Sequence, residues 1–393
     1  MASIPVLDRV EDAVRRRGAD LIELSHAIHA EPELAFAEHR SCAKTQSLAA
    51  ERGFEITAAA GGLDTAFRAD FGAGPLAVGV CAEYDALPGI GHACGHNIIA
   101  ASAVGAALAL ADVADELGLK VALLGTPAEE FGGGKVLLLN AGVFDDLVAA
   151  VMMHPGPVDI AAARSLTLSA VRVEYRGREA HASAAPFLGV NAADATTVAQ
   201  VAIGLLRQQL AHGQQVHGIV SEGGQVANVI PSRTELQYTM RATEALSLAD
   251  LEGKVGDCFL AGAVATGCEY SVEQTEPMYD ALKPDRWLAG AIRDEMTRLG
   301  RTPVDEELEA KLPLGSTDMG NVTQFLPGIH PMVAVDVGGA SLHQPEFAAA
   351  AIGPSADKAV VDGAIMLART VVRLAESPDE RDRVLAAREE RRL

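Results

Sequence analysis

The chain has 393 residues, of which 49% are hydrophobic and only 4% are aromatic. This length exceeds what one ordinary hydrophobic core spans, so two domains are expected. Lys and Arg number 32 against 53 Asp and Glu, which gives a net charge of −21. Such an acidic surface repels nucleic-acid backbones and anionic lipids, and we therefore expect neither nucleic acid nor a membrane as a partner.

The cysteines and the N-terminal segment indicate a cytoplasmic protein. The five cysteines, at positions 42, 81, 94, 258 and 268, are odd in number and include no Cys-x-x-Cys pair, so neither a disulfide scaffold nor a zinc ribbon is supported. The first residues lead directly into a charged helical pattern without the apolar stretch of a signal peptide. The Ala-rich run 98–111 is typical of a buried helix and not of a membrane span.

The first part of the chain alternates helices with short buried strands. Helical spacing extends over 8–30 and ends near Pro32, and a second helix is expected over 38–52. Buried strands are expected over 78–82, 121–125 and 148–153, with a helix beginning near Asn97 between the first two. This alternation predicts an α/β domain with a mixed, mostly parallel sheet flanked by helices. Polar residues that follow the strand ends lie where such sheets form ligand clefts, and they are Asp85, His96, Glu130 and His154.

The pattern changes near Ser165. Residues 167–176 alternate apolar and polar side chains, which is typical of a half-exposed antiparallel strand. A helix over 191–210, strands over 215–220 and 235–241, a helix over 246–263 and a strand over 270–274 complete a β-α-β-β-α-β order. We therefore predict a catalytic metal-binding domain formed by 1–165 and 281–393. An α+β, ferredoxin-like lid or dimerisation domain is inserted over 166–280, and the tail over 376–393 is expected to be a charged helix or a fraying end.

The stretch from His92 to Asn97, which reads HACGHN, carries the most information about chemistry. It places His92, Cys94 and His96 within five positions, and a pair of glutamates follows at 129 and 130. Thiolate, imidazole and carboxylate together are the ligands of a transition-metal site, and the paired carboxylate indicates hydrolysis. Because Cys94 and His96 are two positions apart, an extended loop turns both side chains to the same side.

Taken in order, these motifs resemble the aminoacylase/carboxypeptidase superfamily of dinuclear metallopeptidases. They are most similar to its amidohydrolase branch, which contains hippurate, auxin-conjugate and p-aminobenzoyl-glutamate hydrolases. The matching segments span nearly the whole chain: His29–Glu33, Glu83–Pro88, HACGHN, Gly125–Glu130, Met153–Pro155, Ala180–Ala182, Ala227–Pro231, Ser316–Gly320 and the segment around His343. The resemblance implies a zinc-exopeptidase-like fold and two divalent metal ions per subunit, Zn²⁺ or Mn²⁺, with Co²⁺ or Ni²⁺ as further options.

The resemblance also implies roles for individual residues of the first domain. The metal ligands it implies are Cys94, His96, Glu130, His154 and His343, with Cys94 bridging the two ions. Glu129 is implied as the general base, which activates a water molecule and then protonates the leaving amine. Asp85 is implied as the group that orients one of the ligands.

Three residues of the inserted domain receive roles by the same resemblance. His181 is expected to reach into the cleft of a partner subunit and to polarise the scissile carbonyl. Asn228 and Arg241 are expected to hold the substrate, and Arg241 suits a bidentate grip on a carboxylate. A histidine that acts in the partner's site requires a homodimer.

The chain also departs from the pattern of these hydrolases. Asn97 stands where they usually carry Asp, Glu83 stands where related enzymes often carry Arg, Lys or His, and Gln344 replaces the usual Thr after His343. We interpret Asn97 and Glu83 as markers of a subgroup similar to p-aminobenzoyl-glutamate hydrolases and dipeptidases. Of the remaining histidines, His92 is expected to shape its loop, while His26 and His29 are expected to pack within the first domain.

These observations predict a metal-dependent amidohydrolase that cleaves the amide bond of small N-acyl or N-aroyl amino acids such as p-aminobenzoyl-glutamate. One alternative is a dipeptidase or exopeptidase acting on small dipeptides, in which an inward-pointing Glu83 would suit a free amino terminus. Another is a catalytically silent homologue that binds a metal or a ligand. The presence of Glu129 and of every implied metal ligand argues against the silent homologue.

Overall fold

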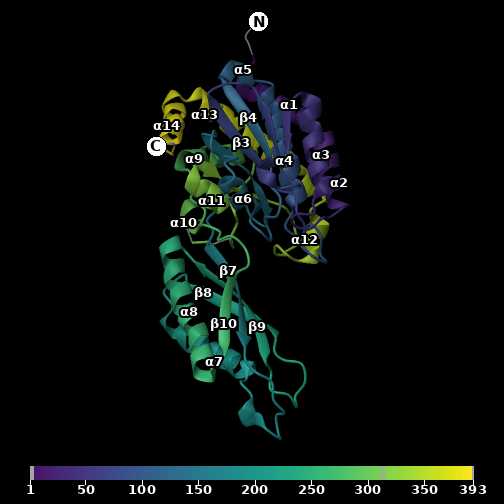
Figure 1. Ribbon diagram of the computed structural model, residues 1–393. Helices are drawn as coiled ribbons and strands as arrows, with labels where there is room; N and C mark the ends of the chain where they lie inside the picture. The colour runs from purple at the N-terminus through teal and green to yellow at the C-terminus, as the bar shows by residue number, and fades with distance from the viewer. Residues whose placement is uncertain (1–3, 310, 313–314, 392–393) are drawn as a thin grey trace. The chain divides into compact units, whose positions relative to one another are not determined.

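The computed structural model describes residues 4–309, 311–312 and 315–391 (Figure 1). The chain forms two compact units, which we call unit 1 (Met1–Arg164 with Leu282–Leu393) and unit 2 (Ser165–Ala281). Across the described residues, no helix combines the length and the apolar character that crossing a membrane requires.

Unit 1 is built around a six-stranded sheet with the order β1-β2-β4-β3-β5-β11. Its strands are β1 (Glu55–Ala58), β2 (Phe67–Phe71), β3 (Leu76–Ala82), β4 (Leu119–Gly125), β5 (Ala149–Val151) and β11 (Gly328–Ile329). Strands β4, β3, β5 and β11 run parallel, whereas β1, β2 and β4 pair antiparallel. Two further strands, β6 (His154–Gly156) and β12 (Met332–Ala334), pair with each other in a separate parallel sheet. The predicted mixed, mostly parallel sheet is thus confirmed.

The described helices of unit 1 are α1 (Val6–Arg16), α2 (Gly18–His29), α3 (His39–Arg52), α4 (His96–Ala111), α5 (Ala114–Leu117), α6 (Gly134–Asn140), α9 (Arg286–Arg298), α10 (Glu306–Glu309), α11 (Met319–Phe325), α12 (Pro345–Ala350), α13 (Pro354–Glu376) and α14 (Pro378–Arg391). The prediction of one helix over 8–30 is wrong. The backbone of Arg17 leaves the helical region, with φ −92° and ψ 0°, and its N–H bonds Val14 in a tighter turn, so α1 and α2 are separate.

Helix α4 connects the core of unit 1 to the residues expected to bind metal. All of its residues are buried, as its Ala-rich, nearly charge-free sequence predicts. The small side chains let α2 and α13 approach closely, since a Cβ added at Gly105 would lie 2.6 Å from Leu21 Cδ1 and 2.8 Å from Ala364 Cβ. Because α4 begins at His96, close packing along the helix fixes the position of that imidazole.

Unit 2 follows the predicted β-α-β-β-α-β order. Its elements are β7 (Thr167–Arg176), α7 (Ala192–Leu206), β8 (Gln215–Glu222), β9 (Arg233–Ala242), α8 (Ala245–Thr266) and β10 (Glu269–Gln274). The antiparallel sheet has the order β10-β7-β9-β8, which places the four strands as in a ferredoxin-like fold. The core of unit 2 contains Tyr175 and Leu236 from the sheet and Val255 and Phe259 from α8.

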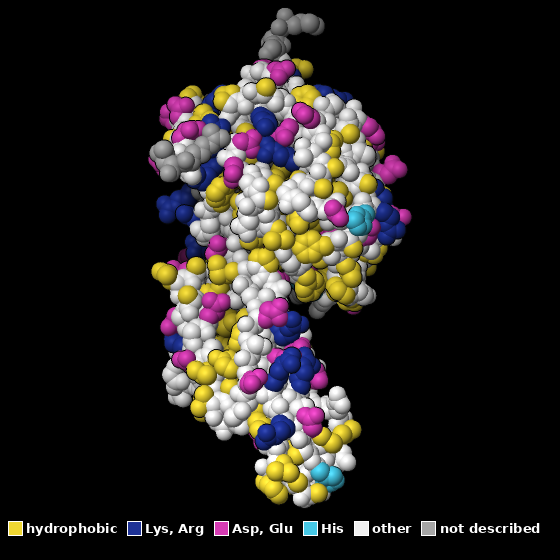
Figure 2. Space-filling view, in the orientation of Figure 1, with side chains coloured by type: hydrophobic (Ala, Val, Ile, Leu, Met, Phe, Trp, Pro, Cys, Tyr) yellow, Lys and Arg dark blue, Asp and Glu magenta, His cyan; other side chains and the backbone are white. Residues whose placement is uncertain are grey.

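Alternate side chains of the sheet in unit 2 are charged instead of apolar. Arg172 pairs with Glu273 at 2.5 Å, and Arg233 pairs with Glu174 at 2.5 Å and with Glu235 at 2.9 Å. Figure 2 shows basic and acidic side chains gathered beside one another on this unit. The first two pairs join neighbouring strands and the third lies within β9, so opposite charges balance one another on this face of the sheet.

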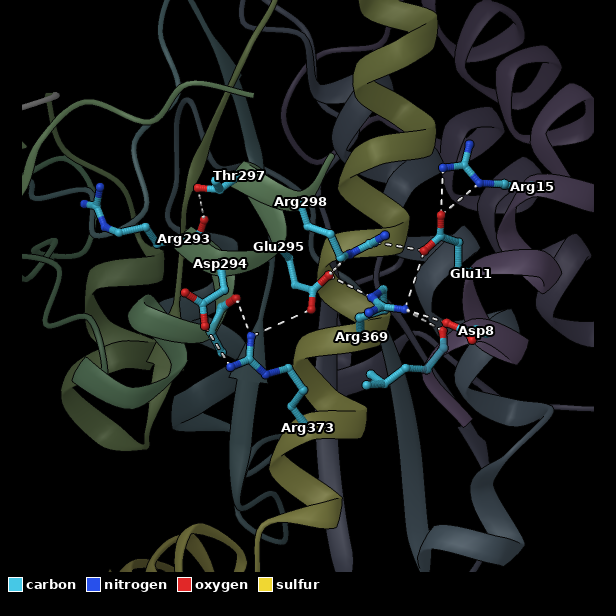
Figure 3. Close-up of polar contacts among 12 residues, drawn as sticks. Asp8, Glu11, Arg15, Arg293, Asp294, Glu295, Thr297, Arg298, Arg369 and Arg373 are labelled. Carbon is cyan, nitrogen blue, oxygen red and sulfur yellow. Dashed lines mark hydrogen bonds and ion pairs between the residues drawn. The ribbon is translucent and has the colours of Figure 1, made fainter. Parts of the chain in front are cut away.

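A buried polar cluster ties α1, α9 and α13 together in unit 1 (Figure 3). Glu295 Oε2 accepts hydrogen bonds from Arg369 Nε and Arg298 Nε, both at 2.7 Å, and Arg298 also pairs with Glu11 at 2.9 Å. Arg369 Nη1 donates to the Leu7 carbonyl at 2.9 Å. Glu295 and Arg369 are both buried, so each charge depends on the other.

We expect Glu295→Ala to destabilise the protein by about 3–5 kcal/mol, because it removes the nearest and most buried carboxylate of the Arg369 guanidinium. Arg15→Ala is the matched control in the same cluster, since it removes an exposed partner of Glu11 and should cost about 1 kcal/mol or less. Urea unfolding of both variants measures the difference. Equal effects of the two substitutions would show that Arg369 does not depend on Glu295.

Candidate metal centre

The predicted metal ligands meet at the carboxyl ends of the parallel strands in unit 1. His96 begins α4, which follows the loop after β3, Glu130 lies in the loop after β4, and His154 begins β6 shortly after β5. Gly95, with φ +75°, allows the HACGHN loop to pack on the residue after His154, because a Cβ there would lie 2.5 Å from Pro155 Cγ. Three separate segments are therefore brought to one edge of the sheet.

Five predicted ligands form two overlapping groups. The ligand atoms of Cys94, His96 and His154 lie within 4.8 Å of one another, and so do those of Cys94, Glu130 and His343. Cys94 belongs to both groups, which is the arrangement needed for a thiolate that bridges two cations. Its sulfur lies 3.5 Å from His154 Nε2, and His343 Nε2 lies 3.4 Å from Glu130 Oε1.

Hydrogen bonds fix which nitrogen of each buried histidine can bind a metal. His96 Nδ1 lies 2.8 Å from Asp85 Oδ1 and donates to it, which leaves the lone pair on Nε2. His154 Nδ1 lies 2.6 Å from the Pro155 carbonyl and donates to it, so its Nε2 lone pair faces Cys94. Burial lowers the pKa of His154 to about 4, and the ring is therefore neutral, as a metal ligand must be.

The donor atoms are those that a divalent cation would satisfy. His96 Nε2 is buried and finds no hydrogen-bond partner in the described part of the chain. Burial and the charge of Glu130 raise the pKa of the Cys94 thiol well above its usual range, so a thiolate at this position needs a cation beside it. The residues present thus fit a metal centre with nitrogen, oxygen and sulfur ligands.

Asp85 joins two of the ligand segments, as expected for an orienting group. One of its oxygens accepts from His96 Nδ1, and the other accepts from the backbone N–H of Glu130 at 2.9 Å. Burial opposes ionisation of Asp85, but His96 and the Glu130 N–H outweigh it and lower the pKa of this carboxyl. One buried carboxylate therefore orients both an imidazole and a loop that carries a ligand.

Glu129, the predicted general base, is buried beside these ligands. Its Oε2 lies 3.9 Å from His96 Nε2. Burial and the neighbouring charges of Glu83 and Glu130 raise the pKa of Glu129 well above its ordinary value. A carboxyl in this environment can hold a proton as well as accept one, which general acid–base catalysis requires.

Three residues near the centre are not among the predicted site residues, although the dipeptidase alternative gave an inward-pointing Glu83 a role. Glu83 points inward, and its Oε2 lies 3.5 Å from His96 Nε2, while Lys135 Nζ lies 2.5 Å from its Oε1. The ring of His330 stacks on that of His154 with 5.4 Å between the ring centres. The position of Glu83 after β3 is a usable signal, and so is the His-Pro dipeptide that His330 shares with His154. Lys135 carries no such signal, because a lysine in the first turn of a helix is usually exposed.

Two histidines of α2 and Asn97 contribute to packing. His26 Nε2 lies 2.8 Å from Asp357, and His29 Nε2 lies 2.8 Å from the Ala348 carbonyl, so both tie α2 to the C-terminal segment as predicted. Asn97 donates to Ser25 Oγ at 2.8 Å and to the Ala351 carbonyl at 3.0 Å. Asn97 therefore connects helices, and Asp85 serves His96 instead.

The predicted residues of unit 2 lie at two ends of its sheet. Arg241 pairs in register with Leu168 on β7, at the end where the chain enters and leaves the unit. His181 lies beyond the other end, in a bridge with Val229, and Ala182 N–H donates to the Asn228 carbonyl at 3.0 Å. The structure thus brings His181 and Asn228 together and separates both from Arg241.

A buried carboxylate from the start of α3 supports the loop that carries Glu129 and Glu130. Glu38 Oε1 accepts the backbone N–H of Ala128 at 2.9 Å, and Ala128 has the left-handed φ of +59°. Burial and the charge of Asp85 raise the pKa of Glu38 to about 7. Its neighbour Glu33 instead accepts from Ser41 and Arg40, whose hydrogen bonds outweigh burial and lower the pKa of Glu33.

The raised pKa predicts a pH-dependent gain in stability for Glu38→Gln. Between about pH 4.5 and pH 7 the folded protein binds more protons at Glu38 than the unfolded chain does, so wild-type stability falls as pH rises. A shift of this size corresponds to about 3 kcal/mol, which a neutral amide at this position avoids. Relative to wild type, the variant should therefore be more stable at pH 8 than at pH 5 by urea unfolding.

Glu33→Gln is the control for this comparison. Its depressed pKa confines its proton linkage to acid pH, so its effect should be the same at pH 5 and pH 8. A Glu38→Gln effect that is also independent of pH would contradict a raised pKa at Glu38.

Comparison with known proteins agrees with this centre. The family model described as peptidase family M20/M25/M40 matches residues 79–372. A mouse Xaa-Arg dipeptidase is 42% identical over 343 residues, which cover 82% of this chain and 78% of that protein. A p-aminobenzoyl-glutamate hydrolase polypeptide from Escherichia coli is 29% identical over 313 residues, which cover 74% of this chain and 65% of that protein.

Solved structures show the same fold. A dinuclear metal-binding peptidase of family M20 from Bacillus subtilis superposes with a TM-score of 0.68 at 21% identity, covering 91% of this chain and 99% of that one. An aminobenzoyl-glutamate utilization protein from Klebsiella pneumoniae gives a TM-score of 0.70 at 17% identity, covering 90% and 98%. The chain is therefore a hydrolase that belongs to peptidase family M20/M25/M40.

Proposed function

We propose that the protein is a metal-dependent dipeptidase, with N-acyl amino acids as its second substrate class. The observation that carries a hydrolytic metal centre is the pair of ligand groups that share Cys94 beside the buried Glu129. The preference for dipeptides is supported by the Xaa-Arg dipeptidase at 42% identity, against 29% for the p-aminobenzoyl-glutamate hydrolase polypeptide. The relatives thus favour the alternative that sequence reasoning ranked second.

Five residues would hold the two divalent cations: Cys94, His96 and His154 for one, and Cys94, Glu130 and His343 for the other. When bound, the cations supply Lewis-acid polarisation of the substrate carbonyl and lower the pKa of water. Zn²⁺ suits the sulfur and nitrogen donors, and Mn²⁺ suits the carboxylates.

Glu129 would move the proton. As water attacks the scissile carbonyl carbon, the Glu129 carboxylate accepts a proton from that water, and the protonated carboxyl then donates it to the leaving amine nitrogen. Because burial and two neighbouring carboxylates raise the pKa of Glu129, this carboxyl holds a proton more firmly than a solvated glutamate does. This kind of proton transfer contributes about 10²–10⁴-fold to the rate.

His181 would stabilise the carbonyl oxygen as it gains negative charge. Its Nδ1 accepts the backbone N–H of Ser183 at 3.3 Å and of Ala184 at 3.2 Å, so the ring proton lies on Nε2. An Nε2–H that is aimed by the backbone is a suitable donor, and one such donor is worth about 3–4 kcal/mol in the transition state. Arg241 would bind the carboxylate that both proposed substrate classes carry.

A homodimer follows from these roles. Arg233 and Arg241 lie eight residues apart on β9, and the pairing of β7 with β9 places His181 beyond Arg233. At the rise per residue of a strand, His181 and Arg241 are therefore about 25 Å or more apart in one chain. Two copies can place His181 of one beside Arg241 of the other. Exposed apolar side chains on α7 and α8 supply a surface for association, and they are Val201, Leu205, Leu260 and Val264.

Light scattering coupled to size exclusion tests the association. We expect wild type to elute as a dimer, and Val201→Glu with Leu205→Glu to reduce the mass to that of a monomer and the activity at least about tenfold, as loss of an oxyanion donor predicts. An active monomer of either protein would contradict the role of His181 in a partner's site.

A pair of matched substrates tests the specificity. With Mn²⁺- or Zn²⁺-loaded protein, we expect release of arginine from alanyl-arginine to be at least about tenfold faster, in kcat/KM, than release from acetyl-arginine. The two differ in the free amino group and share the scissile amide and the carboxylate. Faster cleavage of acetyl-arginine, hippurate or p-aminobenzoyl-glutamate would favour the N-acyl amino acid class.

Substitution of the base separates an enzyme from a silent binder. Glu129→Gln should lower kcat about 10²–10⁴-fold while the protein still binds two metal ions, because only the proton acceptor is lost. Glu130→Gln is the control and should lose metal. No turnover of any of these substrates by metal-loaded wild type would make a silent metal-binding protein the better description.

A further inference from the structure

A buried charge cluster of three residues adjoins the proposed metal ligands. Glu83 follows β3, Lys135 lies in the first turn of α6 and Asp318 precedes α11, and all three are buried with none of their surface exposed. Lys135 Nζ lies 2.5 Å from Glu83 Oε1 and 2.6 Å from Asp318 Oδ1. The backbone N–H of Lys135 also donates to Asp318 Oδ2 at 2.8 Å.

Within the cluster, two carboxylates share one lysine. Lys135 supplies one positive charge to two carboxylates, and Asp318 receives two of its hydrogen bonds. Glu83 Oε2 finds no hydrogen-bond partner in the part of the chain that the structure describes. A buried carboxylate oxygen in this state is costly unless a cation or a donor satisfies it.

The neighbour that Glu83 Oε2 faces is also an electron-pair donor. His96 Nε2 lies 3.5 Å away, and because Nδ1 donates to Asp85, Nε2 is the ring nitrogen that is left for a cation. A cation between Nε2 and Glu83 Oε2 would be bound by both atoms. Ligand atoms of Glu83, His96 and Glu129 lie within 4.8 Å of one another.

We propose that Glu83 is a further ligand of the cation bound by His96, and that Lys135 and Asp318 are positioning residues that turn Glu83 Oε2 toward it. This inference rests on the metal centre of the proposed function. Glu83 adds an oxygen donor to the Cys94, His96 and His154 set, and oxygen ligands favour Mn²⁺ relative to the sulfur and nitrogen donors that suit Zn²⁺. The competing view is that the three residues only tie β3, α6 and α11 together.

Metal binding distinguishes the two views without reference to activity. Full-length protein is freed of metal with a chelator and titrated with Mn²⁺ and with Zn²⁺ by calorimetry, and the bound metal is counted. For Glu83→Gln we expect one of two ions to bind at least about tenfold more weakly, with the larger loss for Mn²⁺, while the other ion is unaffected. Glu295→Gln, which alters a buried ion pair elsewhere in unit 1, should leave both affinities unchanged.

A second variant tests the role of Glu83 even if Glu83→Gln folds poorly. Lys135→Met removes the positive charge beside Glu83 Oε1, so the metal-free protein should unfold at a lower temperature than wild type. If Glu83 is a ligand, the cation replaces the missing charge, and the rise in Tm on adding metal should be larger than in wild type.

Two results would overturn the role of Glu83 but not the five-ligand centre. One is that Glu83→Gln binds both ions with wild-type affinity. The other is that metal raises the Tm of Lys135→Met no more than it raises that of wild type. Wild type that binds no metal would overturn the metal centre itself, and the role of Glu83 with it.

Discussion

In the described centre of unit 1, buried carboxylates outnumber buried lysine and arginine side chains. Five carboxylates are collected at the ends of β3 and β4 and before α11, and they are Glu83, Asp85, Glu129, Glu130 and Asp318. Lys135 is the buried cation that faces this group, and burial of unpaired charge costs several kcal/mol per ion, of the order of the whole stability of a domain. Divalent cations would compensate this charge, and metal binding would then be coupled to folding.

Few hydrogen bonds are needed to aim the ligands, because each supporting group serves two segments. Asp85 holds both the His96 ring and the Glu130 backbone, and Glu38 holds the left-handed turn at Ala128 just before Glu129. Left-handed backbone is unfavourable for alanine by about 1–2 kcal/mol, so this turn persists only while its surroundings hold it. The packing of α4 against α2 and α13 then transmits the rigidity of the core to His96.

Site residues can be predicted best from the sequence where a short motif lies at the end of a strand. Cys94, His96 and His154 each follow a buried run, so their convergence at one sheet edge could be expected from strand order alone. The break at Arg17 could not, because it depends on how α1 and α2 each pack on the core. Lys135 reads as an ordinary surface lysine, and only the fold reveals that Asp318, 183 residues away, lies beside it. The role of Glu38 could not be predicted either, because Glu38 accepts the backbone N–H of Ala128 and no side-chain pattern indicates such a contact.

Whether the protein prefers dipeptides or acylated amino acids depends on which side chains recognise a free amino group. Glu83 points inward, as a role with an amino terminus would require, but it is fully buried and already faces the Lys135 ammonium. Its second oxygen faces the proposed metal ligand His96, so Glu83 is better suited to a metal than to a substrate. Recognition of the amino group then falls to side chains that solvent can reach, among which are Asn228 and the neighbours of His181 in unit 2. Since His181 and Arg241 lie at opposite ends of that sheet, the substrate pocket we propose is assembled from two copies, and specificity depends on their association as much as on the metal ligands.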